Sequence, residues 1–153
     1  MRSIENDQFV FYELDPRLGK GRELARTGLS PSITGDWELW PDGLFIAIPN
    51  HDPQNAKIRV ISLDATEPDR AERVVTPDGM RNLMGVAWGA GGEWYVTEKT
   101  PLEVALFYVD REGHSWELLT SPTTLFAVPS RNGLKIAFPQ NITSSNVWLI
   151  NGF

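Results

Sequence analysis

The chain has 153 residues, of which 41% are hydrophobic, and it carries a formal net charge of −6. This length is sufficient for one globular domain, and the acidic charge argues against nucleic-acid binding, which needs clustered Lys and Arg. The sequence has no Cys, which excludes disulfides, thiol catalysis and Cys-based metal sites. Its polar start and short apolar runs predict no targeting signal and no membrane span, and they leave cytoplasm and periplasm both open.

The chain opens with two predicted strands, at residues 9–15 and 23–27. The first is rich in aromatic and β-branched residues, which favour strands. The second contains Glu, Leu, Ala and Arg, which also form helices readily. We assign it as a strand because its later counterparts are strand-like.

Residues 36–48 predict a hairpin, in which an apolar strand, a tight turn ending in Gly43 and a second apolar strand follow one another. Further predicted strands follow at residues 58–64 and 72–76. The same order then returns. It gives a hairpin at 85–96, strands at 105–110 and 117–120, a hairpin at 126–138 and a strand at 147–151.

The spacing of these elements indicates a repeat. The turn glycines Gly43, Gly92 and Gly133 lie 49 and 41 residues apart, and the third strands end at intervals of 49, 46 and 41. A period of roughly 40 to 45 residues is typical of four-stranded propeller blades. We therefore expect an all-β fold, a partial β-propeller of about three to three and a half four-stranded antiparallel blades.

This propeller segment is predicted to occupy residues 1–153 as one unit. Its parts are a partial blade at 1–29, blades at 30–78 and 79–122, and an incomplete blade at 123–153. Closed rings typically have four to eight blades, so we expect further blades or self-association. An uncovered blade face exposes about 600 Å² of apolar surface, and leaving it uncovered costs about 15 kcal/mol of stability. One option for covering it is that the first strand pair completes the last blade.

Several segments resemble TolB-like propeller repeats, namely the Trp40-Pro41-Asp42-Gly43 turn and residues 48–53, 58–60, 81–88 and 137–150. The consensus Ser-Pro-Asp-Gly turn of that family is replaced here by Trp-Pro-Asp-Gly, Gly-Ala-Gly-Gly and Ser-Arg-Asn-Gly. More narrowly, the chain looks like the C-terminal end of large bacterial proteins with a winged-helix or Ser/Thr kinase domain upstream. The resemblance implies a sensor or interaction scaffold and places catalysis in other domains.

The sequence contains no recognisable catalytic motif. It has neither the phosphate loop, lysine and Asp-bearing loop of kinases nor the Gly-x-Ser-x-Gly elbow of serine hydrolases. His51-Asp52, with Asp36, Asp42 or Glu98 nearby, is a faint metal candidate, but Asn, Asp and Pro in such a loop more often serve turn chemistry. We predict no metal and no cofactor.

Six tryptophans allow two interpretations, a stacking surface for sugars or peptides and packing between blades. Four of them lie inside repeated strands, which favours packing. Trp116 follows a polar turn, and we expect its side chain to be exposed.

The predicted binding site lies where the richer loops emerge. In an antiparallel meander, the connections after the second and fourth strands of each blade share one face, and function concentrates in such loops. We predict a ligand-binding site there, with hydrated connections as the alternative. Its residues are Asn50, His51, Asp52, Arg81, Asn82, Glu98 and Lys99.

These features predict a non-catalytic module that binds a protein or small ligand, the sensor or interaction end of a larger bacterial regulatory protein. The alternative is the accessory propeller of an enzyme such as a prolyl-oligopeptidase-type serine hydrolase. The flanking reading frame distinguishes the two. A hydrolase domain there favours the enzyme, and a kinase or winged-helix domain favours the regulator.

Overall fold

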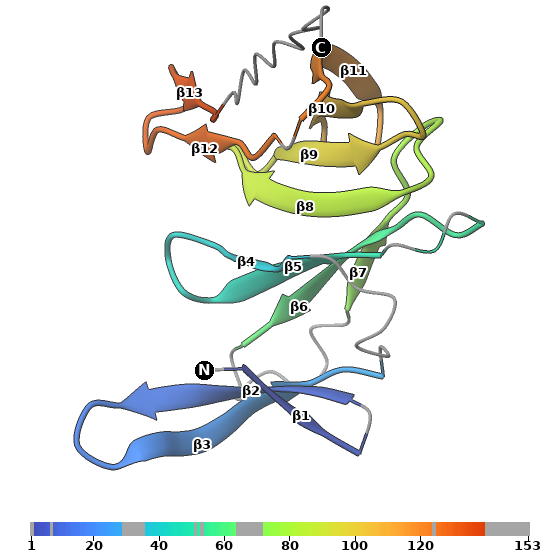
Figure 1. Cartoon of the computed structure of the whole chain (residues 1–153). Helices are drawn as coiled ribbons and strands as arrows, with labels where there is room; N and C mark the ends of the chain where they lie inside the picture. The colour runs from blue at the N-terminus through green and yellow to red at the C-terminus, as the bar shows by residue number, and fades with distance from the viewer. Residues whose placement is uncertain are drawn as a thin grey trace, which may run out of the picture.

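The structure is a computed structural model that describes residues 2–6, 8–28, 36–50, 52, 54–63, 72–123 and 125–139. Within these residues it contains 13 strands and no helix, and the strands form four antiparallel sheets. The prediction of an all-β fold is confirmed. The sheets follow one another along the chain, from blue to red in Figure 1.

The first sheet has the order β1-β2-β3 and consists of β1 (Arg2–Glu5), β2 (Gln8–Asp15) and β3 (Gly19–Arg26). The strand assignment of residues 23–27, against a helical turn, is confirmed by β3. In contrast, β1 is not among the predicted strands, because its four residues include only one β-branched side chain, Ile4. Its conformation depends on pairing with β2, where Ser3 faces Val10 and Ile4 faces Phe9.

The second and third sheets each have four strands, and chain neighbours are also neighbours in space. The second consists of β4 (Glu38–Leu39), β5 (Phe45–Pro49), β6 (Ile58–Ser62) and β7 (Arg73–Val75). The third consists of β8 (Leu83–Trp88), β9 (Trp94–Lys99), β10 (Val104–Val109) and β11 (Ser115–Ser121). Both follow the strand order that the sequence predicts.

The fourth sheet has two strands in the described part of the chain, β12 (Val128–Pro129) and β13 (Ile136–Ala137). The strand predicted at residues 147–151 lies outside the described residues.

The repeated turns close in similar ways. In the first, Trp40 N donates to Phe45 O at 2.8 Å and Gly43 N donates to Trp40 O at 2.8 Å. In the last, Ser130 N donates to Lys135 O at 2.8 Å and Gly133 N donates to Ser130 O at 2.9 Å. Gly43 and Gly133 have φ of 77° and 69°, a left-handed conformation that favours glycine. The sequence similarity of these turns therefore reflects one hydrogen-bonding pattern.

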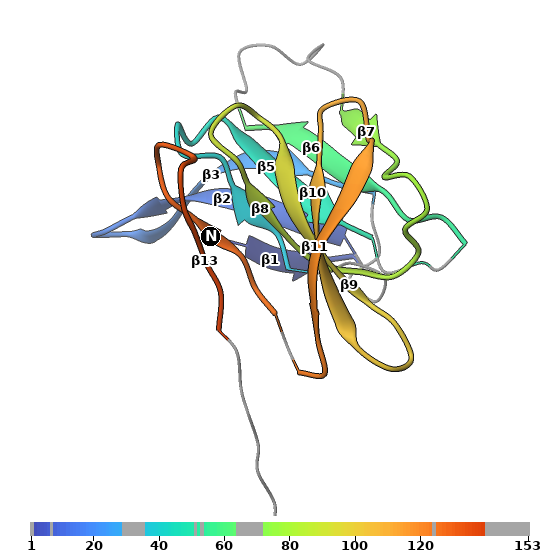
Figure 2. The ribbon, with the colours of Figure 1, turned by 90° about the horizontal axis from the view of Figure 1, so that it is seen from above.

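Apolar side chains fill the space between successive sheets, which lie in layers in Figure 1 and overlap when seen from above in Figure 2. On β5, Ile46 and Ile48 pack with Phe9 and Phe11 of the first sheet, whereas Ala47 belongs to the cluster shared with the third sheet. Successive side chains of a strand point to opposite faces. The second sheet is therefore buried on both faces, which explains its nearly continuous apolar strands.

The third sheet repeats this arrangement. Val86 and Val96 pack toward the second sheet, and Ala87 and Tyr95 pack with Leu125 beside the fourth sheet. The first strands of the second and third sheets also approach each other: Asp36 forms an isolated parallel bridge with Gly85, and Asp36 N donates to Met84 O at 3.1 Å. The two sheets therefore have the same orientation in the stack.

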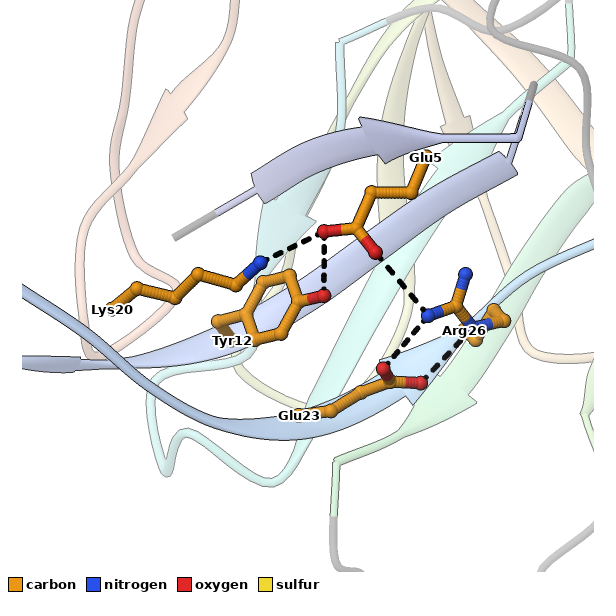
Figure 3. A network of polar contacts seen from close by, with 5 residues as sticks. All are labelled: Glu5, Tyr12, Lys20, Glu23 and Arg26. Carbon is orange, nitrogen blue, oxygen red and sulfur yellow. Dashed lines mark hydrogen bonds and ion pairs between the residues drawn. The ribbon is translucent and has the colours of Figure 1, made fainter.

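The two ends of the stack differ. On the outer face of the first sheet, Glu5 accepts hydrogen bonds from Tyr12 at 2.7 Å and Lys20 at 2.8 Å and pairs with Arg26, as Figure 3 shows. These bonds lower the pKa of Glu5 to about 2. Apolar side chains of the fourth sheet and its flanks are exposed instead. They are Phe126, Val128, Leu134 and Phe138.

Candidate functional site

A cavity of about 520 Å³ lies between the second and third sheets. It opens beside the β4–β5, β8–β9 and β10–β11 turns, and we call this side of the stack the cavity edge. Five aromatic or apolar residues, two arginines, one serine and one glycine form its wall. They are Trp40, Phe45, Val60, Ser62, Arg73, Trp88, Gly92, Trp94 and Arg111.

Residues at the first hairpins of the second and third sheets supply the aromatic part of the wall. Trp40 follows β4, and Trp88 ends β8, the first strand of the next sheet. Their rings meet edge to face, with centroids 4.4 Å apart and an interplanar angle of 86°. Trp94 is paired across the hairpin with Trp88, and their centroids lie 5.5 Å apart. The alignment of the two sheets therefore brings these tryptophans into one aromatic surface.

The indole N–H groups of Trp88 and Trp94 differ in their hydrogen bonding. Trp88 Nε1 donates to Glu38 O at 3.3 Å. Trp94 is only 1% exposed, and within the described residues its Nε1 has no hydrogen-bond partner. A buried donor without an acceptor costs about 1–3 kcal/mol. Because Nε1 itself has almost no accessible surface, an acceptor in the cavity reaches this donor only if the Trp94 ring turns.

Two guanidinium groups complete the wall. Arg73 of β7 lies over the Trp94 ring, 5.7 Å from its centroid, and donates to Arg111 O. Arg111, in the β10–β11 turn, donates to Gly91 O and lies against Gly92, whose φ of 90° favours glycine. Neither arginine forms an ion pair with a carboxylate of the described residues. Both keep N–H donors available, since each guanidinium carries five.

The predicted site residues fall into two groups at the opposite edge, where the β5–β6 and β9–β10 connections and residues 80–82 lie. We call this side the loop edge. Asn50 is 3% exposed; its Oδ1 accepts from Asp52 N at 2.9 Å and its Nδ2 donates to Asn55 O at 3.2 Å. Asp52 Oδ1 accepts from Gln54 N at 3.0 Å. Both side chains thus have the turn chemistry that the sequence offered as the alternative to a metal site.

Arg81, Asn82, Glu98 and Lys99 are brought together in the third sheet. Glu98 Oε1 accepts from Arg81 N at 2.6 Å and from Asn82 N at 3.2 Å. Asn82 Nδ2 donates to Lys99 O at 3.1 Å, and Lys99 N donates to Asn82 O at 3.0 Å. These bonds fix the segment that enters β8.

His51, the remaining predicted residue, lies outside the described residues. No described hydrogen bond or ion pair joins the Asn50 group to the Glu98 group, and neither described cavity is lined by a predicted site residue. In the part of the chain that the structure describes, no group of three or more His, Asp or Glu side chains could hold a metal ion.

The sequence interpretation of the tryptophans describes only part of their arrangement. Trp94 is buried as expected for packing, and Trp116 is 52% exposed as predicted. Trp40 and Trp88 are half-buried and line the cavity. One signal could have indicated this surface: tryptophans flank two of the three repeated turns, on the same side of the meander as Arg111.

The described residues include no helix that is long and apolar enough to cross a membrane. Comparison of the chain with protein-family models, with curated proteins and with solved structures finds no match.

Proposed function

We propose that this chain is a segment of a TolB-like β-propeller, with about three to three and a half blades, that acts as a non-catalytic binding module. The scaffold part of the proposal is supported by the stack of antiparallel meanders, since a propeller repeats such sheets side by side. The parallel approach of β4 and β8 is also what neighbouring blades have at their inner strands.

The observation that carries the binding part is the cavity between the second and third sheets. Its volume of about 520 Å³ falls in the range of small-ligand pockets, about 300–1,000 Å³, and such pockets combine apolar walls with a few polar groups. Trp40, Trp88 and Trp94 supply the walls, and the free donors of Arg73 and Arg111 supply the polar groups. This set is suited to holding a ligand in a defined orientation.

In the larger protein, this module acts as a sensor or interaction end of a bacterial regulator, with the remaining blades supplied by further chain or by a second copy. This role rests on the resemblance of the repeats. A ligand in the cavity contacts both the second and the third sheet, so its binding couples occupancy to the spacing of the two sheets.

The test is a fragment screen read by the indole N–H signals of the ¹⁵N-labelled 153-residue chain. We expect the binding fragments to shift the signals of Trp88 and Trp94 and to leave that of Trp116 unchanged. Trp116 is the matched control, because it is exposed and does not line the cavity. Single Trp→Phe variants assign the three signals.

The proposal fails if no fragment shifts the Trp88 or Trp94 signal while fragments bind elsewhere. Turnover of peptide or ester substrates by the purified chain, abolished by changes at the loop edge, would also overturn it in favour of an enzyme.

A further inference from the structure

We infer that the cavity between the second and third sheets recognises a flat aromatic molecule that carries a carboxylate. This inference rests on the proposed function and names the chemical class of its ligand. Three features support it: the aromatic wall, the two arginines without a carboxylate partner, and the orphaned indole donor of Trp94.

The aromatic wall selects a flat apolar body. The ring planes of Trp40 and Trp88 meet at 86°. The two rings therefore form a nearly right-angled corner. Aromatic groups favour offset-stacked or edge-to-face contacts, which stabilise a complex beyond the burial of apolar area. Phe45 and Val60 extend this corner across the second sheet. A planar ring therefore gains more in this corner than a saturated ring of similar size.

The arginines select the charge. Arg73 and Arg111 come from neighbouring sheets, and each uses donors on a backbone carbonyl without meeting a carboxylate of the described residues. Asp110 and Glu112 flank Arg111 in the sequence, and the Glu93 carboxylate lies against Gly89 and Gly91. None of these three carboxylates lines the cavity. Arginine binds carboxylates through paired N–H groups. Two unneutralised guanidinium groups also repel a cation.

The indole donor of Trp94 sets a further requirement. Its Nε1 is buried and lacks an acceptor, and Arg73 lies over the same ring. Nε1 has almost no accessible surface, so a carboxylate held by Arg73 would accept from it only after the indole ring turns toward the cavity. That hydrogen bond would relieve the cost of the orphaned donor. An acceptor that also carries negative charge satisfies the arginine and the indole together.

The experiment compares three probes by titration into the full chain, with isothermal calorimetry for affinity and indole N–H signals for location. The probes are 2-naphthoate, the neutral 2-naphthylmethanol, and cyclohexanecarboxylate, a saturated anion. We expect 2-naphthoate to bind about tenfold or more tightly than either of the others, since a charge-assisted hydrogen bond contributes about 1.5–3 kcal/mol. The Trp94 N–H signal should move downfield with 2-naphthoate alone.

Variants test the role of the arginines. In the double variant Arg73→Gln with Arg111→Gln, the preference for 2-naphthoate over the neutral probe should fall to within about twofold. Unchanged affinity for the neutral probe shows that the cavity persists. Arg22→Gln is the matched control, because Arg22 is an exposed arginine of the first sheet that pairs with Glu13. If the double variant does not fold, Arg73→Lys and Arg111→Lys keep the charge and should retain only part of the preference.

Each other outcome has a definite meaning. If the neutral probe binds as tightly as 2-naphthoate and shifts Trp88 and Trp94, the carboxylate inference is wrong and the proposed binding function stands. If 2-naphthoate binds without moving the Trp94 signal, or keeps its preference in the Gln double variant, the inference is also wrong. If neither the probes nor any screened fragment reaches the cavity, the proposed function itself fails.

Discussion

At the loop edge, Glu98 and Asn50 use their side-chain oxygens to accept hydrogen bonds from backbone N–H groups of their own sheets. At the cavity edge, Trp94 Nε1 has no acceptor among the described residues, and Arg73 and Arg111 face no carboxylate. Both edges carry polar residues at repeated positions. The difference lies in whether their hydrogen-bonding capacity is already satisfied within the chain, and the unsatisfied groups mark the better candidate for a binding site.

The largest effect on stability is expected from Glu98→Ala at the loop edge. It removes the acceptor of two backbone N–H groups, those of Arg81 and Asn82, and should lower the free energy of unfolding by about 2 kcal/mol. Chemical denaturation measures this change. Glu103→Ala is the control, because the Glu103 side chain is exposed and makes no hydrogen bond within the described residues. Equal effects of the two substitutions would show that Glu98 is not a structural acceptor.

Asn50→Ala should follow with a loss of about 1 kcal/mol, because it removes two hydrogen bonds within one loop. Gln54→Ala, an exposed position of the same loop, should change the unfolding free energy little. If Asn50→Ala instead lowered the free energy of ligand binding by more than the free energy of unfolding, the loop edge would have a binding role. The comparison between the loop edge and the cavity edge would then be reversed.

Two matched substitutions compare the indoles of the cavity edge. Trp88→Phe loses the hydrogen bond to Glu38 O, whereas Trp94→Phe loses no hydrogen bond and removes an orphaned donor. We expect Trp94→Phe to be less destabilising by about 1 kcal/mol, although Trp94 is the more buried side chain. Thermal or chemical unfolding of both variants measures the difference. The reverse order would mean that Trp94 Nε1 is satisfied in solution.

The smallest effect on stability at neutral pH is expected at Glu5 of the first sheet. Like Glu98 and Asn50 at the loop edge, Glu5 already uses its side-chain oxygens to accept hydrogen bonds. Because its pKa is lowered from 4.5 to about 2, its contribution to stability is fully present above pH 4.5. It is lost as the pH falls toward 2. Glu5→Gln should flatten this part of the stability–pH curve, and Glu13→Gln is the exposed control on β2. A curve that Glu5→Gln leaves unchanged would contradict the network in Figure 3.

Much of the fold could be predicted because its signals are local. Gly43 and Gly133 mark turns that close with the same hydrogen bonds, and short runs of apolar residues mark the strands beside them. β1 escaped prediction because its pairing with β2, not its composition, makes it a strand. The type of residue at positions 50 and 98 indicated polar loops, but not that local backbone groups already occupy their oxygens.

The sequence by itself determined most of the strands, their turns and the all-β class, since each depends on residues that are close along the chain. Only the tertiary structure decided which turns face each other. Trp40 and Trp88 lie in different sheets, and Arg73 and Arg111 are 38 residues apart, so their meeting depends on how one sheet is aligned over the next. That alignment results from the packing of apolar faces across the layers, which no local pattern records, and it leaves the donors of Trp94, Arg73 and Arg111 beside one cavity.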